Sequence, residues 1–234
     1  MSNDFSNIGF RIEGPEDVFR VHSRNADLIR RFQNRQNSIS EVLCPDENIR
    51  LWFYNHCSDA APGYRTGKPI SVTPNDWVSD PGEFPAILQV FCTKEPVLLN
   101  VDIPVPCSLE RLLADPCRMD LVLFAQCIRV YQDKTDYEES GDSRMAAEAV
   151  IPCGAFSPTN DPDFVPSAKA MINGIVAAAE RRTNPIDELD YCVIKIFCLG
   201  ERFTIVADPE FFDKLPDAGN VIRGIYWLSG QIVD

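Results

Sequence analysis

Residues 167–182 read Ser-Ala-Lys-Ala-Met-Ile-Asn-Gly-Ile-Val-Ala-Ala-Ala-Glu-Arg-Arg, and their conformation decides the fold of the second half of the chain. The alanines and Ser167 favour a helix, because alanine has the highest helix propensity and serine is a preferred N-cap. Gly174, near the middle, costs a helix about 1 kcal/mol relative to alanine. Propensity alone therefore favours a helix, and a strand over residues 168–181 is the competing interpretation.

The sequence on both sides of this stretch has the alternating pattern of β-strands. In residues 191–198 the apolar positions 192, 194, 196 and 198 share one face, so Cys192 and Cys198 are predicted to be small core residues. The polar stretch 133–144 is predicted to be an exposed loop. Strands are predicted over residues 120–131, 148–156, 191–198, 201–207 and 220–233, with a short helix at 208–215.

The beginning of the chain predicts helix and strand together. Residues 8–12 alternate like a strand, and a helix is predicted to begin at Pro15, because proline suits the first helical position and acidic residues complement the positive helix end. Apolar spacing of three to four residues extends the predicted helix to Phe32. Two further strands are predicted at 38–43 and 48–56.

The middle of the chain is rich in proline. Nine of the 18 prolines lie between Pro62 and Pro116, which predicts connector or edge structure containing short strands at 86–91 and 97–103 and one helical turn at 108–113. A boundary near residue 116 divides the chain into an α+β unit with a Pro-rich connector, residues 1–116, and a second unit, residues 117–234.

Several short segments, spread over most of the chain, resemble a family of uncharacterised bacterial proteins. The resemblance is loose in the proline-rich centre. It rests on Ile8-Gly9-Phe10, Pro15-Glu16-Asp17, Leu51-Trp52-Phe53, Ile151-Pro152-Cys153-Gly154-Ala155-Phe156, Asn173-Gly174-Ile175-Val176, Arg182-Thr183-Asn184-Pro185, Val206-Ala207-Asp208-Pro209 and Tyr226-Trp227-Leu228-Ser229-Gly230.

The resemblance implies an architecture and no activity. It implies that the last hundred or so residues form a five-stranded Greek-key barrel of the oligonucleotide/oligosaccharide-binding (OB) type, in which a glycine lets one strand curl and a short helix precedes the last strand. On this basis residues 168–181 are predicted to be a strand. The predicted fold class is α+β and mostly β, with an N-terminal α+β unit and a C-terminal five-stranded OB-like barrel.

The charge balance disfavours several functions. With 22 basic and 35 acidic residues the 234-residue chain carries a net charge of −13, which repels phosphate backbones and anionic membranes. Residues 1–118 hold 12 basic and 16 acidic side chains, and residues 119–234 hold 10 and 19. Since residues 119–234, nearly all of the predicted barrel, carry −9 of the total, nucleic-acid binding by this unit is disfavoured.

Neither the cysteines nor the histidines have the spacing of a catalytic or metal site. The nine cysteines form no closely spaced pairs of the kind that bind zinc, and no secretory leader is evident, so reduced core thiols in a cytoplasmic protein are predicted. His56 and Cys57 are adjacent on a predicted strand and therefore point to opposite faces. The chain has no glycine-rich phosphate loop, and we expect no cofactor and no metal ion.

Seven aromatic and basic residues are the candidate binding residues. Trp52, Tyr54 and His56 share one face of a predicted strand, which indicates either a stacking platform or sheet packing. Arg181 and Arg182 end the strand that contains Gly174. The last strand adds the aromatic residues Tyr226 and Trp227.

The sequence thus predicts a non-enzymatic, cytoplasmic protein-binding protein whose acidic surface suits a basic partner. One form of this interpretation is an immunity-like or antitoxin-like protein that covers a basic effector. A hydrolase-type enzyme, with Trp52, Tyr54 and His56 facing Arg181 and Arg182 between the two units, is the first alternative. A single-stranded nucleic-acid-binding OB protein is the second. The oligomeric state is not predicted.

Overall fold

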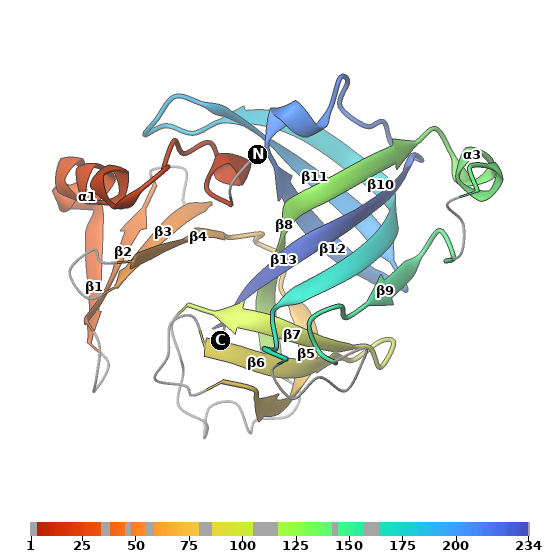
Figure 1. Cartoon of the computed structure of the whole chain (residues 1–234), viewed down its shortest axis with the longest axis horizontal. Helices are drawn as coiled ribbons and strands as arrows, with labels where there is room; N and C mark the ends of the chain where they lie inside the picture. Colours follow the sequence, from red (N-terminus) through yellow and green to blue (C-terminus); the bar gives the residue numbers. More distant parts are fainter. Residues whose placement is uncertain are drawn as a thin grey trace.

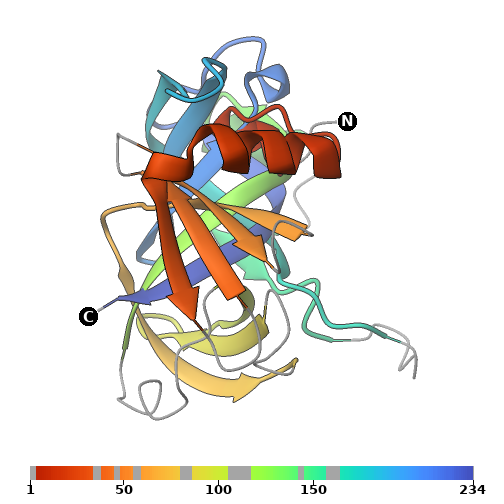
Figure 2. The ribbon, with the colours of Figure 1, turned by 90° about the vertical axis from the view of Figure 1, so that its left-hand side faces the viewer.

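The structure is a computed structural model that describes residues 4–33, 38–44, 48–54, 59–79, 86–104, 117–141, 145–156 and 164–233 (Figure 1). The described chain is mostly β, as predicted. It contains a four-stranded sheet, with the order β1-β2-β3-β4, and a nine-stranded sheet. The four-stranded sheet lies beside the larger one, and α1 runs across its end (Figure 2).

The four-stranded sheet is an antiparallel meander that follows a single helix. The helix α1 (Pro15–Arg24) begins at the predicted proline and buries Val18 and Val21. A short 3-10 helix, η2 (Ala26–Leu28), leads from it into the sheet. The strands are β1 (Ile29–Gln33), β2 (Ser38–Leu43), β3 (Ile49–Tyr54) and β4 (Asp59–Tyr64).

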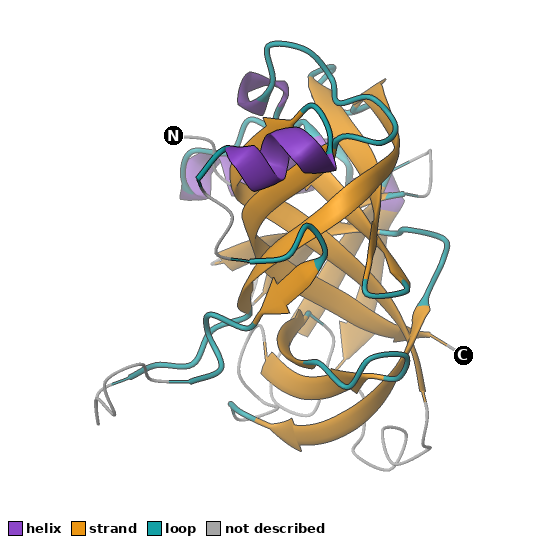
Figure 3. Ribbon diagram, turned by 90° about the vertical axis from the view of Figure 1, so that its right-hand side faces the viewer, coloured by secondary structure: helices purple, strands orange, loops and turns teal. Residues whose placement is uncertain are grey.

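Five strands of the larger sheet form a closed ring of pairings. The strand β8 (Cys117–Tyr131) runs parallel to β12 (Glu201–Ala207). Antiparallel pairings then lead from β12 to β11 (Asp190–Cys198), to β10 (Lys169–Thr183), to β13 (Val221–Val233) and back to β8. The long strands wrap around a common interior in Figure 3.

A second set of three strands pairs with the other ends of β8 and β13. The antiparallel strands β5 (Ile70–Trp77), β6 (Ala86–Cys92) and β7 (Leu98–Ile103) follow one another. Ile70 of β5 pairs with Met119 of β8, and Asp102 of β7 pairs with Ser229 of β13. The larger sheet therefore contains strands from both sides of residue 116, near which the boundary between two units is predicted.

The two faces of β8 belong to different cores. Leu121 and Leu123 point into the interior of the larger sheet, together with the inward residues of β10 to β13. Val122 and Phe124 point outward and pack against the four-stranded sheet, against residues such as Leu51 of β3. This alternation follows from the two-residue period of a strand and joins the N-terminal segment to the outside of the ring.

The structure has a strand where the sequence left helix and strand in competition. The strand β10 covers residues 168–181 almost completely, as the resemblance implies, and it continues into a hairpin with β11. A Cβ at Gly174 would lie 2.7 Å from the backbone oxygen of Phe197, so β11 approaches too closely for any side chain there. Cys192 and Cys198 are buried in the core, as predicted.

Several predictions near the N-terminus are wrong. Residues 8–12 form no strand, because Ser6–Ile8 is a 3-10 helix, η1, and Gly9 takes a left-handed φ of 70°. The predicted helix to Phe32 ends at Arg24, because Ile29–Gln33 pairs with β2 as strand β1. The predicted helix was too long because apolar residues recur every three to four positions as far as Phe32. The pairing of this segment with β2 outweighs that local pattern.

Further corrections concern the second half and the centre. The predicted loop 133–144 contains a helix, α3 (Lys134–Glu139), which Asp133 caps. The strand predicted at 148–156 is limited to β9 (Ala149–Ile151), and the helix predicted at 208–215 to a 3-10 turn, η3 (Pro209–Phe211). In the proline-rich segment, β6 lies between β5 and β7 rather than at an edge. The turn predicted at 108–113 lies outside the described residues.

Candidate functional site

The predicted aromatic face of β3 is buried. Trp52 and Tyr54 are only 2% and 3% exposed and form a small cluster with Ile39 of β2. The Tyr54 hydroxyl donates a hydrogen bond to the backbone oxygen of Pro104, and burial raises the pKa of Tyr54 above its usual value. Both rings therefore pack within the structure, and neither offers a free face for stacking. His56 lies outside the described residues.

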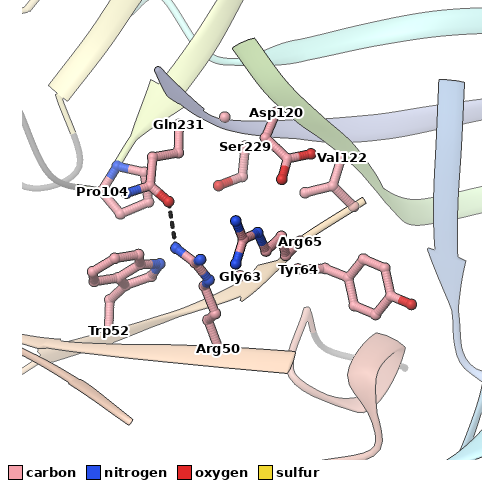
Figure 4. A pocket seen from close by; sticks show the side chains of 11 residues that line it. Arg50, Trp52, Gly63, Tyr64, Arg65, Pro104, Asp120, Val122, Ser229 and Gln231 are labelled. Atoms are coloured by element: carbon pink, nitrogen blue, oxygen red, sulfur yellow. Dashed lines mark hydrogen bonds between the residues drawn. The ribbon is translucent and has the colours of Figure 1, made fainter. Parts of the chain in front are cut away.

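A polar cluster joins β3 to the larger sheet beside these rings (Figure 4). Arg50 of β3 forms an ion pair with Glu41 at 3.2 Å, donates a hydrogen bond to Gln231 and lies over the Trp52 ring. Asp120 of β8 accepts a hydrogen bond from the Thr66 backbone at 3.0 Å. The cavity between these side chains is about 20 Å³, which is room for a single water molecule. The cluster therefore joins the two sheets and leaves no space for a substrate.

The two arginines of β10 lie at its end, away from Trp52. Arg182 donates hydrogen bonds to the Tyr64 hydroxyl of β4 at 3.1 Å and to Glu180 at 2.7 Å. Arg181 lies 3.9 Å from Asp190 across the hairpin. The structure thus brings Arg182 to the four-stranded sheet, but its contact there is Tyr64 rather than the predicted aromatic residues.

The two aromatic residues of β13 point to opposite faces. Tyr226 is fully buried inside the larger sheet, and burial raises the pKa of its hydroxyl. Trp227 points outward, packs on Phe124 with ring centroids 4.7 Å apart, and donates a hydrogen bond to Asp102 of β7. Neither ring is free to stack on a base.

Asp102 is a buried carboxyl group with an altered pKa. It is 8% exposed, and burial raises its pKa to about 6, although the Trp227 hydrogen bond opposes this shift and the nearby Asp4 adds to it. Asp4 also has a raised pKa, caused mainly by burial, while its hydrogen bond with Gln126 and the charge of Lys169 lower it. Asp102 lies on β7 beside Trp227 of β13, whereas Asp4 of the N-terminal segment accepts a hydrogen bond from Gln126 of β8.

A groove of about 540 Å³ lies at one end of the larger sheet, among the described residues. Its walls come from the segment that follows η1, from the end of the β10–β11 hairpin and from η3. The lining is partly apolar and partly charged, and consists of Ser6, Gly9, Phe10, Arg11, Ile12, Glu13, Leu189, Asp190, Asp208, Pro209 and Glu210.

Two buried asparagines hold the N-terminal wall of the groove in place. Asn7 donates a hydrogen bond to the backbone oxygen of Ala125 and accepts one from the backbone N–H of Asp208, both at 2.9 Å. Asn184, in the hairpin, donates to the backbone oxygen of Ile8 at 2.9 Å. A Cβ at Gly9 would lie 2.5 Å from the Leu189 backbone oxygen, so glycine permits this close approach.

The groove has a negative charge. Four carboxylates line it, Glu13, Asp190, Asp208 and Glu210, against the single guanidinium of Arg11. Asp208 is committed to capping η3, since it accepts the Glu210 N–H at 2.9 Å. Glu13, Asp190 and Glu210 are exposed to solvent, and Asp190 also accepts a hydrogen bond from the Thr183 hydroxyl at 2.8 Å and lies 3.9 Å from Arg181.

The described residues contain no group of three or more His, Cys, Asp or Glu side chains arranged to hold a metal ion. Within the same residues, no helix is long and apolar enough to cross a membrane. Comparison with family models, with curated proteins and with solved structures gave no match.

Sequence reasoning missed the groove because its walls come from three distant segments. It also missed the Arg50–Glu41 pair and the Asp102 carboxyl. One signal for Arg50 was present, since the alternation of β3 places a charged residue on the same face as Trp52 and Tyr54. No comparable local signal indicates that Asn7 is buried.

Proposed function

We propose that the protein is a non-enzymatic interaction protein that binds a basic segment of another protein in its acidic groove. The groove itself carries the proposal, because it combines apolar walls with carboxylates at the rim. Such a surface fits an extended or turn segment with one or two apolar side chains flanked by lysine or arginine. An immunity-like or antitoxin-like protein that covers a basic effector is one form of this function.

We also propose that the closed ring of β8 and β10 to β13 is an OB-like barrel with a permuted strand order. The ring pairings support this, because a barrel of this type has the order 1-2-3-5-4 and a parallel pair between strands 3 and 5. The strands β10, β11, β12, β13 and β8 match strands 1 to 5, with β12 and β8 as the parallel pair. The turn η3 precedes β13, as the short helix of such barrels does.

This assignment bears on the nucleic-acid alternative. OB barrels bind oligonucleotides on the face of strands 2 and 3, here β11 and β12. In this chain Tyr191 and Val193 of β11 and Val206 of β12 pack against the four-stranded sheet and the N-terminal segment. With that face covered and the groove acidic, the geometry favours a basic protein segment over a single-stranded nucleic acid.

The enzyme alternative has less support. Its predicted site lies between the two units, around Trp52 and Tyr54. The cavity beside Trp52 is about 20 Å³, and Arg50 and Glu41 next to it pair with each other. Tyr54 and Trp52 are packed in the same region. A hydrolase needs a cleft of several hundred cubic ångströms that brings a nucleophile and a base together.

Affinity capture from the source organism at low salt tests the proposed function. The wild-type protein is compared with a groove variant that carries Glu13→Gln, Asp190→Asn and Glu210→Gln. A matched variant removes three charges elsewhere through Glu95→Gln, Glu138→Gln and Glu139→Gln. We expect the wild type and the matched variant to retain the same basic protein and the groove variant to lose it. Capture of no basic protein, or equal capture by all three, contradicts the proposal.

A further inference from the structure

The outer face of the larger sheet carries a row of apolar side chains that crosses four strands. Met171 of β10 pairs with Ile151 of β9 on one side and with Ile225 of β13 on the other. Ile225 in turn pairs with Cys127 of β8. Paired residues of neighbouring strands point to the same face of a sheet, so these four side chains form one continuous apolar row.

The apolar row is open to solvent and hollowed. Ile151 is 44% exposed and Ile225 is 36% exposed, and Cys127 is exposed as well. A cavity of about 210 Å³ lies along the row, and its lining consists of Cys127, Arg129, Met171, Arg223, Gly224 and Ile225. A cavity of roughly 150 Å³ can hold a benzene molecule, so this one has room for a phenyl ring.

Two stretches of chain beside the apolar row project from the sheet. Residues 152–156 follow β9, and residues 164–167 lead into β10; we call these two stretches the arm. In Figures 2 and 3 they run beside each other away from the larger sheet. They point toward the side that faces the reader in Figure 1, where β8, β13 and β10 present their outer face. The arm and the apolar row therefore lie on the same side of the molecule.

The base of the arm is held in place by hydrogen bonds. The Ser167 N–H donates to the backbone oxygen of Gly154 at 3.0 Å, and the side chain of the buried Asn100 of β7 donates to the same oxygen at 3.2 Å. A Cβ at Gly154 would lie 2.0 Å from the Ser167 backbone oxygen, so glycine permits the two stretches to approach each other. These contacts fix the direction in which the arm leaves the sheet.

The arm presents large apolar side chains to solvent. Phe156 is 61% exposed, Val165 is 79% exposed, and Phe164 between them in space or sequence order is partly exposed. Clustered exposed apolar side chains mark surfaces that bind another protein or a ligand. The arm is therefore a candidate contact surface, as is the apolar row.

We propose that the arm of one copy of this chain packs on the apolar row of a second copy, with Phe156 in the cavity. The partner's arm packs on the first copy's row in return. A two-fold axis produces such a reciprocal contact whenever one surface contains both complementary parts. The arm and the row meet this condition, because they lie on one side of the molecule and one supplies a phenyl ring while the other supplies the space for it.

The exposed apolar area is sufficient for a stable dimer. Aromatic side chains bury roughly 150–250 Å² each, so the exposed parts of the arm and the apolar row supply on the order of 500 Å² of apolar surface per copy. A standard interface buries about 800 Å² per partner, of which about 60% is non-polar. The arm and the row thus match the apolar share of such an interface.

This dimer is independent of the acidic groove, and salt distinguishes the two. Two copies that each carry a net charge of −13 repel each other, so added salt is expected to strengthen the dimer. Binding of a basic segment in the groove is expected to weaken with salt, because opposite charges attract there. The variant with Glu13→Gln, Asp190→Asn and Glu210→Gln is expected to dimerise at least as well as the wild type.

Sedimentation velocity over protein concentrations from about 1 to 100 µM tests the proposal. Two matched pairs of variants are compared with the wild type. Phe156→Ser in the arm is matched by Phe19→Ser on α1, whose ring is 63% exposed. Ile225→Ser in the row is matched by Phe197→Ser on β11, which is 41% exposed. Near-UV circular dichroism checks that each variant is folded.

We expect the wild type to dimerise in this range. The dimer dissociation constant is expected to rise at least about 30-fold for Phe156→Ser and about 10-fold for Ile225→Ser, because the two-fold axis repeats each substitution. The two control substitutions are expected to change it less than about threefold. A wild type that stays monomeric throughout, or a dimer that responds equally to all four substitutions, overturns the proposal.

Cross-linking of native thiols tests the arrangement within the dimer. Cys153 lies in the arm and Cys127 in the apolar row, and both are exposed. A short bismaleimide is added to a mixture of isotope-labelled and unlabelled wild-type protein, and mass spectrometry identifies the joined peptides. We expect links between Cys153 of one copy and Cys127 of the other. A dimer that gives no such link between copies overturns the packing of the arm on the row.

Discussion

The side chain of Asn7 donates a hydrogen bond to the backbone oxygen of Ala125, 118 residues further along the chain, at 2.9 Å. The parallel pairing of β8 and β12 ends one position earlier, at Phe124 and Val206. Since Asn7 also accepts a hydrogen bond from the Asp208 N–H, its side-chain amide occupies the place of one more backbone peptide between the two strands. A single side chain thereby fixes the N-terminal wall of the groove to the larger sheet.

Replacement of this residue, Asn7→Ala, is expected to lower the free energy of unfolding by about 2–3 kcal/mol, because it leaves a buried carbonyl and a buried N–H without partners. Urea denaturation measures the change. The control is Asn75→Ala, whose side chain makes an exposed hydrogen bond to Gln89 and is expected to change stability by less than about 0.5 kcal/mol. Equal effects of the two substitutions would contradict this role of Asn7.

Asp102 is expected to lower the free energy of unfolding as pH rises. Most carboxyl groups in proteins act in the opposite direction, because folding usually lowers their pKa. Its pKa is about 6 in the folded protein and 3.8 as the ordinary value, so between pH 4 and 6 the folded state binds more protons than the unfolded state. The contribution of Asp102 to the free energy of unfolding therefore falls as pH rises through this window. The loss is on the order of 3 kcal/mol above pH 6.

The substitution Asp102→Asn tests this prediction, because asparagine remains neutral and can still accept the Trp227 hydrogen bond. We expect the variant to match the wild type near pH 4 and to be more stable than the wild type at pH 7.5. Urea denaturation of both proteins at several pH values gives the difference, in which the other carboxyl groups cancel. A difference that does not change between pH 4 and 7.5 would show that the pKa of Asp102 is ordinary.

Arg50 and Glu41 are expected to behave as a buried ion pair, since their side chains are 15% and 4% exposed. Arg50→Met leaves the Glu41 carboxylate buried without its guanidinium, which is expected to cost about 3–5 kcal/mol. The double variant Arg50→Met with Glu41→Gln is expected to recover most of that loss. Thermal and urea denaturation of the two variants provide the comparison. A double variant no more stable than the single one would contradict a buried charge at Glu41.

Part of the fold could be predicted from the sequence. The two-residue period of residues 191–198 places Cys192 and Cys198 in the core, and Pro15 marks the start of α1. For residues 168–181 the local signals conflict, because the alanines favour a helix while the close approach at Gly174 depends on β11. Helix propensity depends only on a residue and its neighbours in sequence. Whether residues 168–181 form a helix or a strand depends on their pairing with β11.

The parts that could not be predicted depend on contacts between distant segments. Residues 8–12 alternate like a strand, but Gly9 must turn against Leu189, and Asn7 bonds to Ala125 and Asp208. Among the candidate residues, Trp52, Tyr54 and Tyr226 pack in the interior, as aromatic residues on strands commonly do. The groove could not be predicted because no single stretch of sequence contains it.

Zero-length cross-linking of the captured complex tests the central claim most directly. A carbodiimide joins carboxylates to lysines in contact, so it reports which acidic residues meet a basic partner. We predict cross-links from the partner's lysines to Glu13, Asp190 or Glu210 at the groove and none to Glu138 or Glu139 of α3. Cross-links that fall mainly on α3, or are spread evenly over the acidic surface, would contradict the assignment of the groove as the binding site.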